Sequence, residues 1–259
     1  MCLILIGYHA HPAYPLVIAA NRDEYFHRAT REAGFWQDYP SILAGRDLEQ
    51  GGTWLGVDRS GRFAAVTNYR APSHQRKAPE TRSRGLLVRD YLTGASPAYE
   101  YLALVSGNLA LYDGFNLFAG DPQSLAFIGT AVPRPRLLPH GVHGISNGDL
   151  DAPWPKVLLG KARIARLLDT PGDIDTAGLF ELLADRSVPD TVSTPAATGE
   201  DGNSLRMLAP IFVHGEDYGT RCSTVLLYSR DGTVRFMEKS FDQDAMETGT
   251  VSFEFFIEG

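Results

Sequence analysis

The stretch PLVIAANRDE, residues 15–24, passes directly from apolar to polar side chains. Residues 16–20 are small or branched and apolar, a pattern typical of a strand that is buried on both faces. Residues 21–24 then add one amide and three charged groups without a spacer. Two interpretations fit this change: the strand ends at Asn21 in a solvated turn, or it ends in a reactive site.

Strand-like segments occur at both ends of the chain. Residues 2–7, CLILIG, are apolar on both alternating faces, as residues 16–20 are. TWLGV and RFAAVTNY flank the turn-forming residues 58–61 and predict a hairpin. Further strands are expected at 115–121, 124–129, 141–147, 211–214, 220–229, 233–241 and 250–258.

Four segments between these strands have helical character, namely 83–92, 96–108, 154–168 and 175–185. Ser96 and Pro97 suit the N-cap and the first helical position of the second helix, and Asp175 suits the N-cap of the last. Strands at both ends with paired helices between them predict two packed sheets covered by helices, in a single domain that spans residues 1–259.

Composition and charge argue against several classes of function. The chain carries 24 basic and 31 acidic side chains, a net charge of −7, which disfavours nucleic acid and anionic membrane surfaces as partners. No apolar run is long enough to span a bilayer, and the N-terminus lacks the basic region of a signal peptide. The two cysteines, Cys2 and Cys222, form no disulfide framework. We therefore expect a cytoplasmic chain that begins close to Met1.

Segment 188–210 is long and rich in Thr, Pro, Gly and Asp, which makes it the candidate lid of the chain. No metal or cofactor motif is recognisable. His9 and His11 form an H-x-H pair, but no third ligand accompanies them, so no metal site is predicted.

Cys2 follows the initiator methionine at the start of the first predicted strand. Removal of Met1 would place a thiol and an α-amine on the same residue. A free α-amine titrates near about 8, so close to neutral pH part of it is unprotonated and can accept the thiol proton. The nucleophile would then carry its own base. The alternative interpretation is that Cys2 is a small buried apolar residue.

Polar residues at other strand ends are candidates for the same site. Asn68 ends the second strand of the predicted hairpin and Asn147 follows a short apolar strand, and the N–H groups of Asn can stabilise an oxyanion. Arg221 begins a strand and needs an anionic partner or a ligand if it points inward. Each has a structural alternative, because Asn is common in turns and an Arg at a strand start can be solvated.

Together these motifs resemble the NRDE family, also called the transport and Golgi organisation protein 2 family. In order, the motifs are Met-Cys at the start, ANRDE at 20–24, GGTWLGV at 51–57, TNYR at 67–70, GISN at 144–147, PWPK at 153–156 and YGTRCSTVLL at 218–227. They span nearly the whole chain. The resemblance implies links with secretory organisation, haem handling and lipid homeostasis.

A more distant resemblance connects the pattern with N-terminal-nucleophile hydrolases of the choloylglycine hydrolase and penicillin acylase type. It implies an α+β fold, a four-layer α/β/β/α sandwich of two antiparallel sheets, and amide cleavage by an N-terminal Cys. The catalytic candidates that it implies are Cys2, Arg22, Asp23, Asn68, Asn147 and Arg221. The candidate substrate contacts are Asn21, Tyr69 and Arg70.

Under this hypothesis the Cys2 thiol attacks the carbonyl of an amide or thioester in an acyl or lipid-like small molecule. Asn68 and Asn147 would stabilise the oxyanion, and Asp23 would hold the α-amine. Either candidate Arg would pair with Asp23 or with a carboxylate of the substrate. A thioester on Cys2 would then pass its acyl group to water or to another acceptor, without a cofactor.

One departure from the hydrolases bears on the geometry of the site. They separate their Arg and Asp by two residues, whereas Arg22 and Asp23 are adjacent and face opposite ways in an extended strand. The strand must turn there, or only one of the two faces Cys2.

The alternative function is a haem or acyl-lipid carrier on the same fold, in which Cys2 or a nearby His serves as a ligand. The substrate and the oligomeric state are left open by the sequence.

Overall fold

The computed structural model describes residues 2–70, 81–188 and 209–258. The chain forms two compact units, which we describe one at a time. The first contains residues 1–27 and 140–254, and the second contains residues 28–139 and 255–259. The single domain expected for residues 1–259 stays a prediction.

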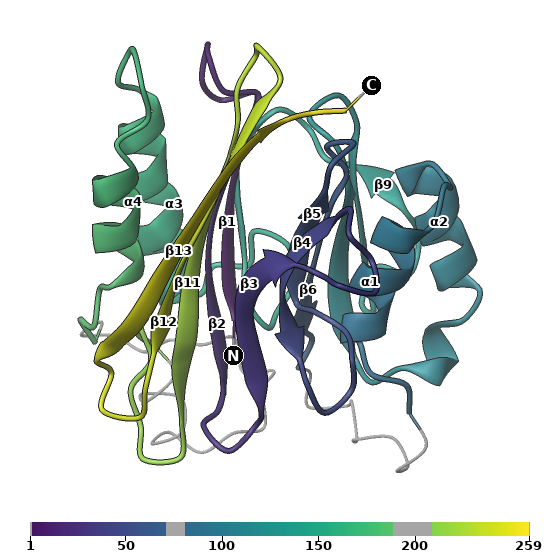
Figure 1. Ribbon diagram of the computed structural model, residues 1–259, viewed down its shortest axis with the longest axis horizontal. Helices are drawn as coiled ribbons and strands as arrows, with labels where there is room; N and C mark the ends of the chain where they lie inside the picture. Colours follow the sequence, from purple (N-terminus) through teal and green to yellow (C-terminus); the bar gives the residue numbers. More distant parts are fainter. Residues whose placement is uncertain (1, 71–80, 189–208, 259) are drawn as a thin grey trace. The chain divides into compact units, whose positions relative to one another are not determined.

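The first unit is built on a six-stranded antiparallel sheet in the order β10-β1-β2-β11-β12-β13 (Figure 1). Two helices, α3 (Pro155–Leu168) and α4 (Thr176–Leu183), cover one of its faces. The strands are β1 (Leu3–Tyr8), β2 (Leu16–Tyr25), β10 (Gly141–Ile145), β11 (Tyr218–Tyr228), β12 (Thr233–Phe241) and β13 (Glu247–Phe256).

Alternate residues of the central strands form the core beneath these helices. Leu5 of β1, Ala19 of β2 and Val225 of β11 pack with Val157 of α3 and Leu179 of α4 in one buried cluster. Because successive strand residues point to opposite faces, the residues between them lie on the face that the helices do not cover. This alternation decides on which side of the sheet each candidate site residue lies.

The termini of α3 and α4 follow the predicted capping rules. Pro155 occupies the first turn of α3, where its missing N–H costs no hydrogen bond. The Asp175 side chain accepts a hydrogen bond of 3.0 Å from the backbone N–H of Gly178 in the first turn of α4. The predicted N-cap role of Asp175 is confirmed, whereas the helix expected to begin at Pro97 begins at Ala98, with Pro97 at the N-cap position and no side-chain cap.

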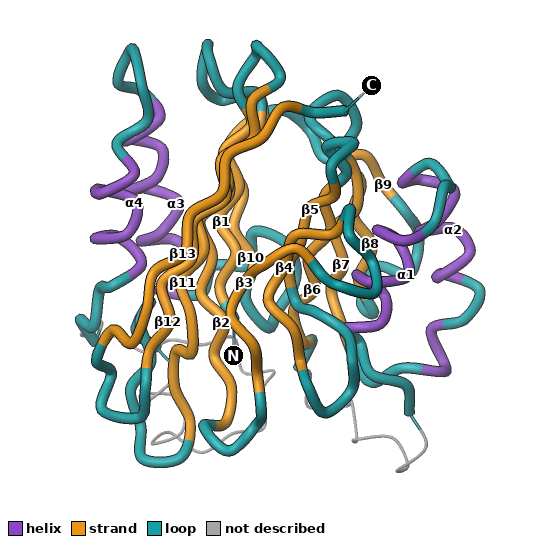
Figure 2. Tube along the Cα trace, viewed as in Figure 1, coloured by secondary structure: helices purple, strands orange, loops and turns teal. Residues whose placement is uncertain are grey.

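The second unit is a seven-stranded antiparallel sheet whose strands lie in chain order, from β3 to β9. Helices α1 (Gly85–Thr93) and α2 (Ala98–Ser106) pack against it, and a 3-10 turn spans Leu109–Leu111. The strands are β3 (Thr30–Phe35), β4 (Ile42–Asp47), β5 (Leu55–Asp58), β6 (Phe63–Asn68), β7 (Phe115–Gly120), β8 (Leu125–Gly129) and β9 (Arg136–Leu137), and Figure 2 shows the helices in purple and the strands in orange.

The hairpin predicted around residues 58–61 joins β5 to β6. Asp58 Oδ1 accepts hydrogen bonds from the backbone N–H groups of Ser60 and Arg62, at 2.9 and 3.0 Å. Gly61 has a φ of 83°, a left-handed value that costs glycine little. The turn therefore depends on one carboxylate and one glycine.

The structure confirms two antiparallel sheets and the four predicted helices, and it corrects two strand assignments. Segment 211–214 is a loop in which residues 211–213 are buried and His214 is exposed, and its β-type pairing is an isolated bridge between His214 and Gly219. The strand that contains residues 16–20 does not end at Asn21, because β2 continues to Tyr25. Hydrogen bonding to β11 keeps these polar residues extended. Strands β3, β4 and β9 were not foreseen.

A buried leucine of the helical layer tests the packing of the first unit. Leu179 of α4 is fully buried, so Leu179→Ala is expected to lower the free energy of unfolding by about 2–5 kcal/mol through lost burial and a residual cavity. The matched control is Leu158→Ala on α3, whose side chain is 54% exposed and should change stability by no more than about 0.5 kcal/mol. Urea denaturation measures both, and equal losses would contradict this packing.

Candidate active site

The register of three strands sets the position of Cys2 relative to Arg22. Strand β1 pairs Leu3 with Asn21 and Ile4 with Ala20, so one further residue places Cys2 opposite Arg22. Strand β11 pairs Cys222 with the same Arg22. Directly opposed residues share a face, and Cys2, Arg22 and Cys222 therefore lie in one row on the face that α3 and α4 do not cover.

Asn147 lies on the other side of Cys2. Strand β10 pairs Ile145 with Ile4, and the same register carried two residues further places Asn147 opposite Cys2. The Ser146 hydroxyl donates a hydrogen bond to the backbone carbonyl of Cys2 at 2.8 Å, which continues the contact past the strand end. Asn147 is fully buried, and its Oδ1 accepts from Ser146 Oγ at 3.4 Å.

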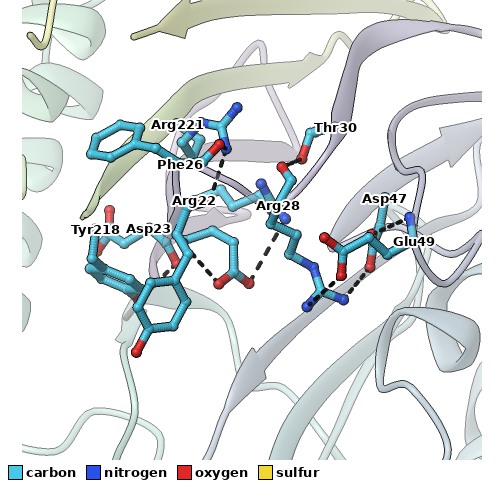
Figure 3. A network of polar contacts seen from close by, with 11 residues as sticks. Arg22, Asp23, Phe26, Arg28, Thr30, Asp47, Glu49, Tyr218 and Arg221 are labelled. Carbon is cyan, nitrogen blue, oxygen red and sulfur yellow. Dashed lines mark hydrogen bonds and ion pairs between the residues drawn. The ribbon is translucent and has the colours of Figure 1, made fainter. Parts of the chain in front are cut away.

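Asp23 points to the opposite face of the sheet from Arg22, because β2 stays extended. Strand β11 bulges at Arg221, so that Thr220 pairs with Asp23 and Cys222 with Arg22. Thr220 Oγ1 donates to Asp23 Oδ1 at 2.8 Å, and the Tyr218 hydroxyl donates to the backbone carbonyl of Asp23 at 2.8 Å. Figure 3 shows Asp23 beside Tyr218.

The cation beside Asp23 is Lys156 of α3. Its Nζ lies 3.7 Å from Asp23 Oδ2, and the two side chains are 1% and 0% exposed. Burial raises the pKa of Asp23, whereas Lys156 and the hydrogen bond from Thr220 oppose this rise. Lys156 thus takes the place predicted for one of the two arginines, since Arg22 extends from the other face of β2.

The surroundings of Cys2 disfavour the thiolate form of its side chain. Burial raises its pKa and the Asp23 carboxylate raises it further, while hydrogen bonding from the Asp23 backbone and the charge of Arg22 oppose the rise. The residue itself is half-buried. A thiol of this kind would need a base in order to act as a nucleophile.

Arg221, the bulged residue, contacts the end of β2. Its Nη1 donates to the backbone carbonyls of Tyr25 at 3.0 Å and Phe26 at 3.2 Å, and its guanidinium lies 5.6 Å from the centre of the Phe26 ring (Figure 3). Burial lowers the pKa of Arg221, and the nearby charge of Arg22 lowers it further. Nη2 of Arg22 itself lies 3.9 Å from Oε2 of Glu24.

Asn21 has a structural position. Its Nδ2 donates to the backbone carbonyls of Leu183 at 2.8 Å and Ile211 at 2.9 Å, and its Oδ1 accepts from Ser223 Oγ at 2.6 Å. The side chain is 1% exposed. These contacts join β2 to the end of α4, and they favour a structural role over the predicted substrate contact.

Asn68, Tyr69 and Arg70 belong to the second unit. Asn68 is the last residue of β6 and pairs with Phe115, and the backbone N–H of Tyr69 donates to Gly114 at 2.9 Å. All three side chains are half-buried. Their roles as an oxyanion donor and as substrate contacts stay predictions.

Among the residues that contact the predicted site residues and were not foreseen are Ser146, Lys156 and Thr220. A signal existed for Lys156, because the buried positions of α3 include 156, 160, 164 and 168 at helical spacing. A lysine at the head of such a stripe points into the protein. Ser146 and Thr220 lie beside predicted site residues, but hydroxyl residues are too common for such a position to single them out.

Cys222 differs from Cys2 in its surroundings. It is buried, and burial together with the nearby Glu238 raises its pKa well above the ordinary value. Glu238 is itself buried and accepts a hydrogen bond from Thr224 at 3.2 Å. Cys222 is therefore the less reactive thiol of the two by environment.

A polar network holds the loop that carries Asn147. His143 Nδ1 lies 2.8 Å from Asp151 Oδ2, while Lys161 Nζ and the Gly144 N–H donate to Oδ1 at 2.7 and 2.9 Å. Burial raises the pKa of Asp151, but the contacts with His143, Lys161 and Gly144 outweigh it and lower the pKa to about 2. Asp151 has a φ of 60°, which is uncommon for a residue with a side chain.

Most of the candidate lid at 188–210 lies outside the described residues. Among those described, no group of three or more His, Cys, Asp or Glu side chains is arranged to hold a metal ion. No helix in the described ranges is long and apolar enough to cross a membrane.

Two solved structures share this fold over nearly the whole chain. Penicillin V acylase from Agrobacterium tumefaciens aligns with 99% of this chain and 86% of its own, with a TM-score of 0.55 and 13% identity. The C2A mutant of conjugated bile acid hydrolase from Clostridium perfringens aligns with 98% of this chain and 92% of its own, with a TM-score of 0.54 and 9% identity. The fold is thus of the N-terminal-nucleophile hydrolase type, as predicted.

Residues 1–243 match the Transport and Golgi organisation 2 family, and the chain belongs to that family. The Transport and Golgi organization protein 2 homolog of Bos taurus is 37% identical, with 98% of this chain and 99% of the homolog covered. The Homo sapiens homolog is 35% identical over the full length of both chains. The family resemblance predicted from the motifs is confirmed.

The depressed pKa of Asp151 predicts a pH dependence of stability. The folded value of about 2 is below the ordinary 3.8, so the stabilisation is complete above the ordinary value and is lost as the pH falls from about 4 to 2. Asp151→Asn should lower the free energy of unfolding at pH 7 by about 1–2 kcal/mol, allowing for the partial exposure of the carboxylate. Denaturation at several pH values should show this difference shrinking below pH 4, and a constant difference would contradict it.

The raised pKa of Cys2 predicts slow alkylation. In a Cys222→Ser background, iodoacetamide should modify Cys2 more slowly at pH 8 than it modifies a cysteine in an unstructured peptide. The rate should still be rising above pH 9, the ordinary value, because the thiolate form is disfavoured. Mass spectrometry at timed intervals measures the rate, and a plateau below pH 9 would refute the predicted environment.

Proposed function

We propose that this protein is an N-terminal-cysteine hydrolase or acyltransferase that acts on an amide or thioester bond of an acyl or lipid-like small molecule. The observation that carries the proposal is the register at one end of the first sheet, which, continued past the ends of β10 and β1, places Asn147 and Arg22 on either side of Cys2. An amide donor and a cation thus flank a thiol that Met1 removal would make N-terminal.

The comparisons support this class of reaction. Both structural neighbours are named for it, one as an acylase and the other as a hydrolase of conjugated bile acids. The bile acid hydrolase structure is that of a C2A mutant, so the unmutated hydrolase has a cysteine at position 2, as this chain does. Their likeness to this chain lies in the fold, and the substrate of this chain is part of our proposal.

The proposed reaction has two steps. In the first, the α-amine of Cys2 takes the thiol proton as sulfur attacks the carbonyl carbon, and the tetrahedral oxyanion accepts a hydrogen bond from Asn147. The carbon–nitrogen bond of an amide, or the carbon–sulfur bond of a thioester, then breaks, and the leaving group receives the proton. In the second step water or another acceptor attacks the thioester on Cys2 and frees the thiol.

The raised pKa of Cys2 is consistent with a reaction in which the thiol is the nucleophile and the α-amine is its base. A neutral thiol does not react before the substrate arrives, and the α-amine would deprotonate it when attack begins. Asp23 would hold that amine in place, and its buried carboxylate already influences the Cys2 thiol. Arg221 and Arg22 would supply positive charge for an anionic part of the substrate.

The test is intact-protein mass spectrometry after exposure to a panel of amide and thioester acyl donors. We expect loss of Met1 and an acyl adduct on the wild type, and no adduct on Cys2→Ala. Cys222→Ser is the matched control, since it removes the second thiol and should still form the adduct. A retained Met1 with no adduct from any donor would contradict the proposal and favour the carrier hypothesis.

A further inference from the structure

Lys156 is the one charged residue of the described α3 whose side chain is fully buried. Its Nζ lies 3.7 Å from Asp23 Oδ2 on the covered face of the first sheet. A buried ion pair contributes little to stability, and apolar side chains of similar size often replace such pairs without loss. The presence of Lys156 therefore calls for an explanation other than packing.

The position of Lys156 makes a positive charge costly. It lies in the first turn of α3, where the helix dipole disfavours a cation. It also heads the buried stripe that continues with Gly160 and Ile164, a place that suits an apolar side chain. Asp23 is the acidic group within 4.0 Å that offsets these costs.

The groups around Asp23 come from three elements. Lys156 approaches Oδ2 from α3, and Thr220 of β11 donates to Oδ1 at 2.8 Å. The charge of Asp23 also raises the pKa of the Cys2 thiol, at the start of β1. The adjacent Arg22 extends from the other face of β2. Lys156 thus lies on the same side of the sheet as the Asp23 carboxylate.

We propose that Lys156 is a positioning residue that keeps Asp23 ionised beside Cys2, so that Asp23 can bind the α-amine that Met1 removal creates. This inference rests on the proposed function and assigns that reaction a further residue. Thr220 orients one carboxylate oxygen and Lys156 attracts the other, so the carboxylate is held from both sides.

The physical consequence concerns the protonation of Asp23. Burial raises the pKa of Asp23, and the charge of Lys156 is the largest influence that opposes this rise. Without Lys156 the carboxyl group would take up a proton at higher pH, and a neutral acid binds an amine less tightly than a carboxylate does. Asp23 would then bind the Cys2 α-amine, the base of the proposed reaction, less tightly.

A direct titration tests the pairing without any substrate. Carboxyl carbon NMR on aspartate-labelled protein, with Asp23→Asn to identify the signal, should show the Asp23 pKa higher by about one unit or more in Lys156→Met. Lys156→Arg, which keeps the charge, should stay near the wild type. Lys161→Met on the same helix is the matched control and should leave Asp23 unchanged. An identical Asp23 titration in Lys156→Met would overturn the proposal.

Acyl-adduct formation under single-turnover conditions tests the positioning role. With a donor that labels the wild type, Lys156→Met should slow adduct formation at saturating donor by about ten-fold or more and move the acidic limb of the pH profile upward. The donor concentration for half-maximal rate should not change, and Lys156→Arg should restore the rate. A Lys156→Met rate and pH profile equal to the wild type would overturn the role.

The two measurements separate the two hypotheses. A wild type that forms no adduct contradicts the proposed function, whereas the NMR titration still decides whether Lys156 keeps Asp23 ionised. Should Lys156→Met not fold, Lys156→Gln replaces it in both measurements, because its amide retains a hydrogen-bond donor without the charge.

Discussion

The antiparallel register of β1, β2 and β11 determines where each polar group of the first unit lies. Side chains alternate between faces along a strand, so a shift of one residue would turn Cys2 toward the helices and Asp23 away from them. The register is held by the apolar residues of the same strands, since Leu5, Ala19 and Val225 must meet α3 and α4. The core thus positions the candidate site residues, whose orientation depends on packing several residues away.

The bulge at Arg221 lets β11 pair with both Arg22 and Asp23, which are adjacent in β2 and point to opposite faces of the sheet. Thr220 must face Asp23 on the covered side of the sheet, and Cys222 must face Arg22 on the other side. The extra residue between them leaves Arg221 to extend to the end of β2, where it binds backbone carbonyls of Tyr25 and Phe26. A bulge of this kind re-aims a side chain while the ladder on either side is kept.

Buried charge imposes the second constraint on this unit. The fully buried carboxylate of Asp23 is stabilised by the hydroxyl of Thr220 in β11 and by Lys156 in α3. The Asn21 side chain donates hydrogen bonds to the backbone carbonyls of two other segments, at Leu183 and Ile211. The polar half of ANRDE is therefore an interior structure, and the interpretation of residues 21–24 as a solvated turn is wrong for the buried residues Asn21, Arg22 and Asp23.

Much of the fold could be predicted from local patterns. Apolar runs identified β1 and β2, and the Pro and Asp residues at helix starts identified α3 and α4, because capping and burial are local properties of the chain. Strands β3, β4 and β9 escaped prediction. In β3, exposed residues such as Arg31 and Glu32 interrupt the alternation that marks a strand, and β9 has only two residues. Segment 211–214 was misassigned for the opposite reason, since a buried loop has the apolar composition of a strand.

The sequence by itself determined the nucleophile candidate, the family and the set of polar residues at strand ends, because those depend on residue identity and order. Only the tertiary structure decided which face each of them occupies. Arg22 and Asp23 are adjacent in sequence yet lie on opposite sides of the sheet. Lys156, 133 positions beyond Asp23, supplies its cation. Pairing of this kind follows from strand register and helix docking, which join residues far apart in the chain and leave no local pattern in the sequence.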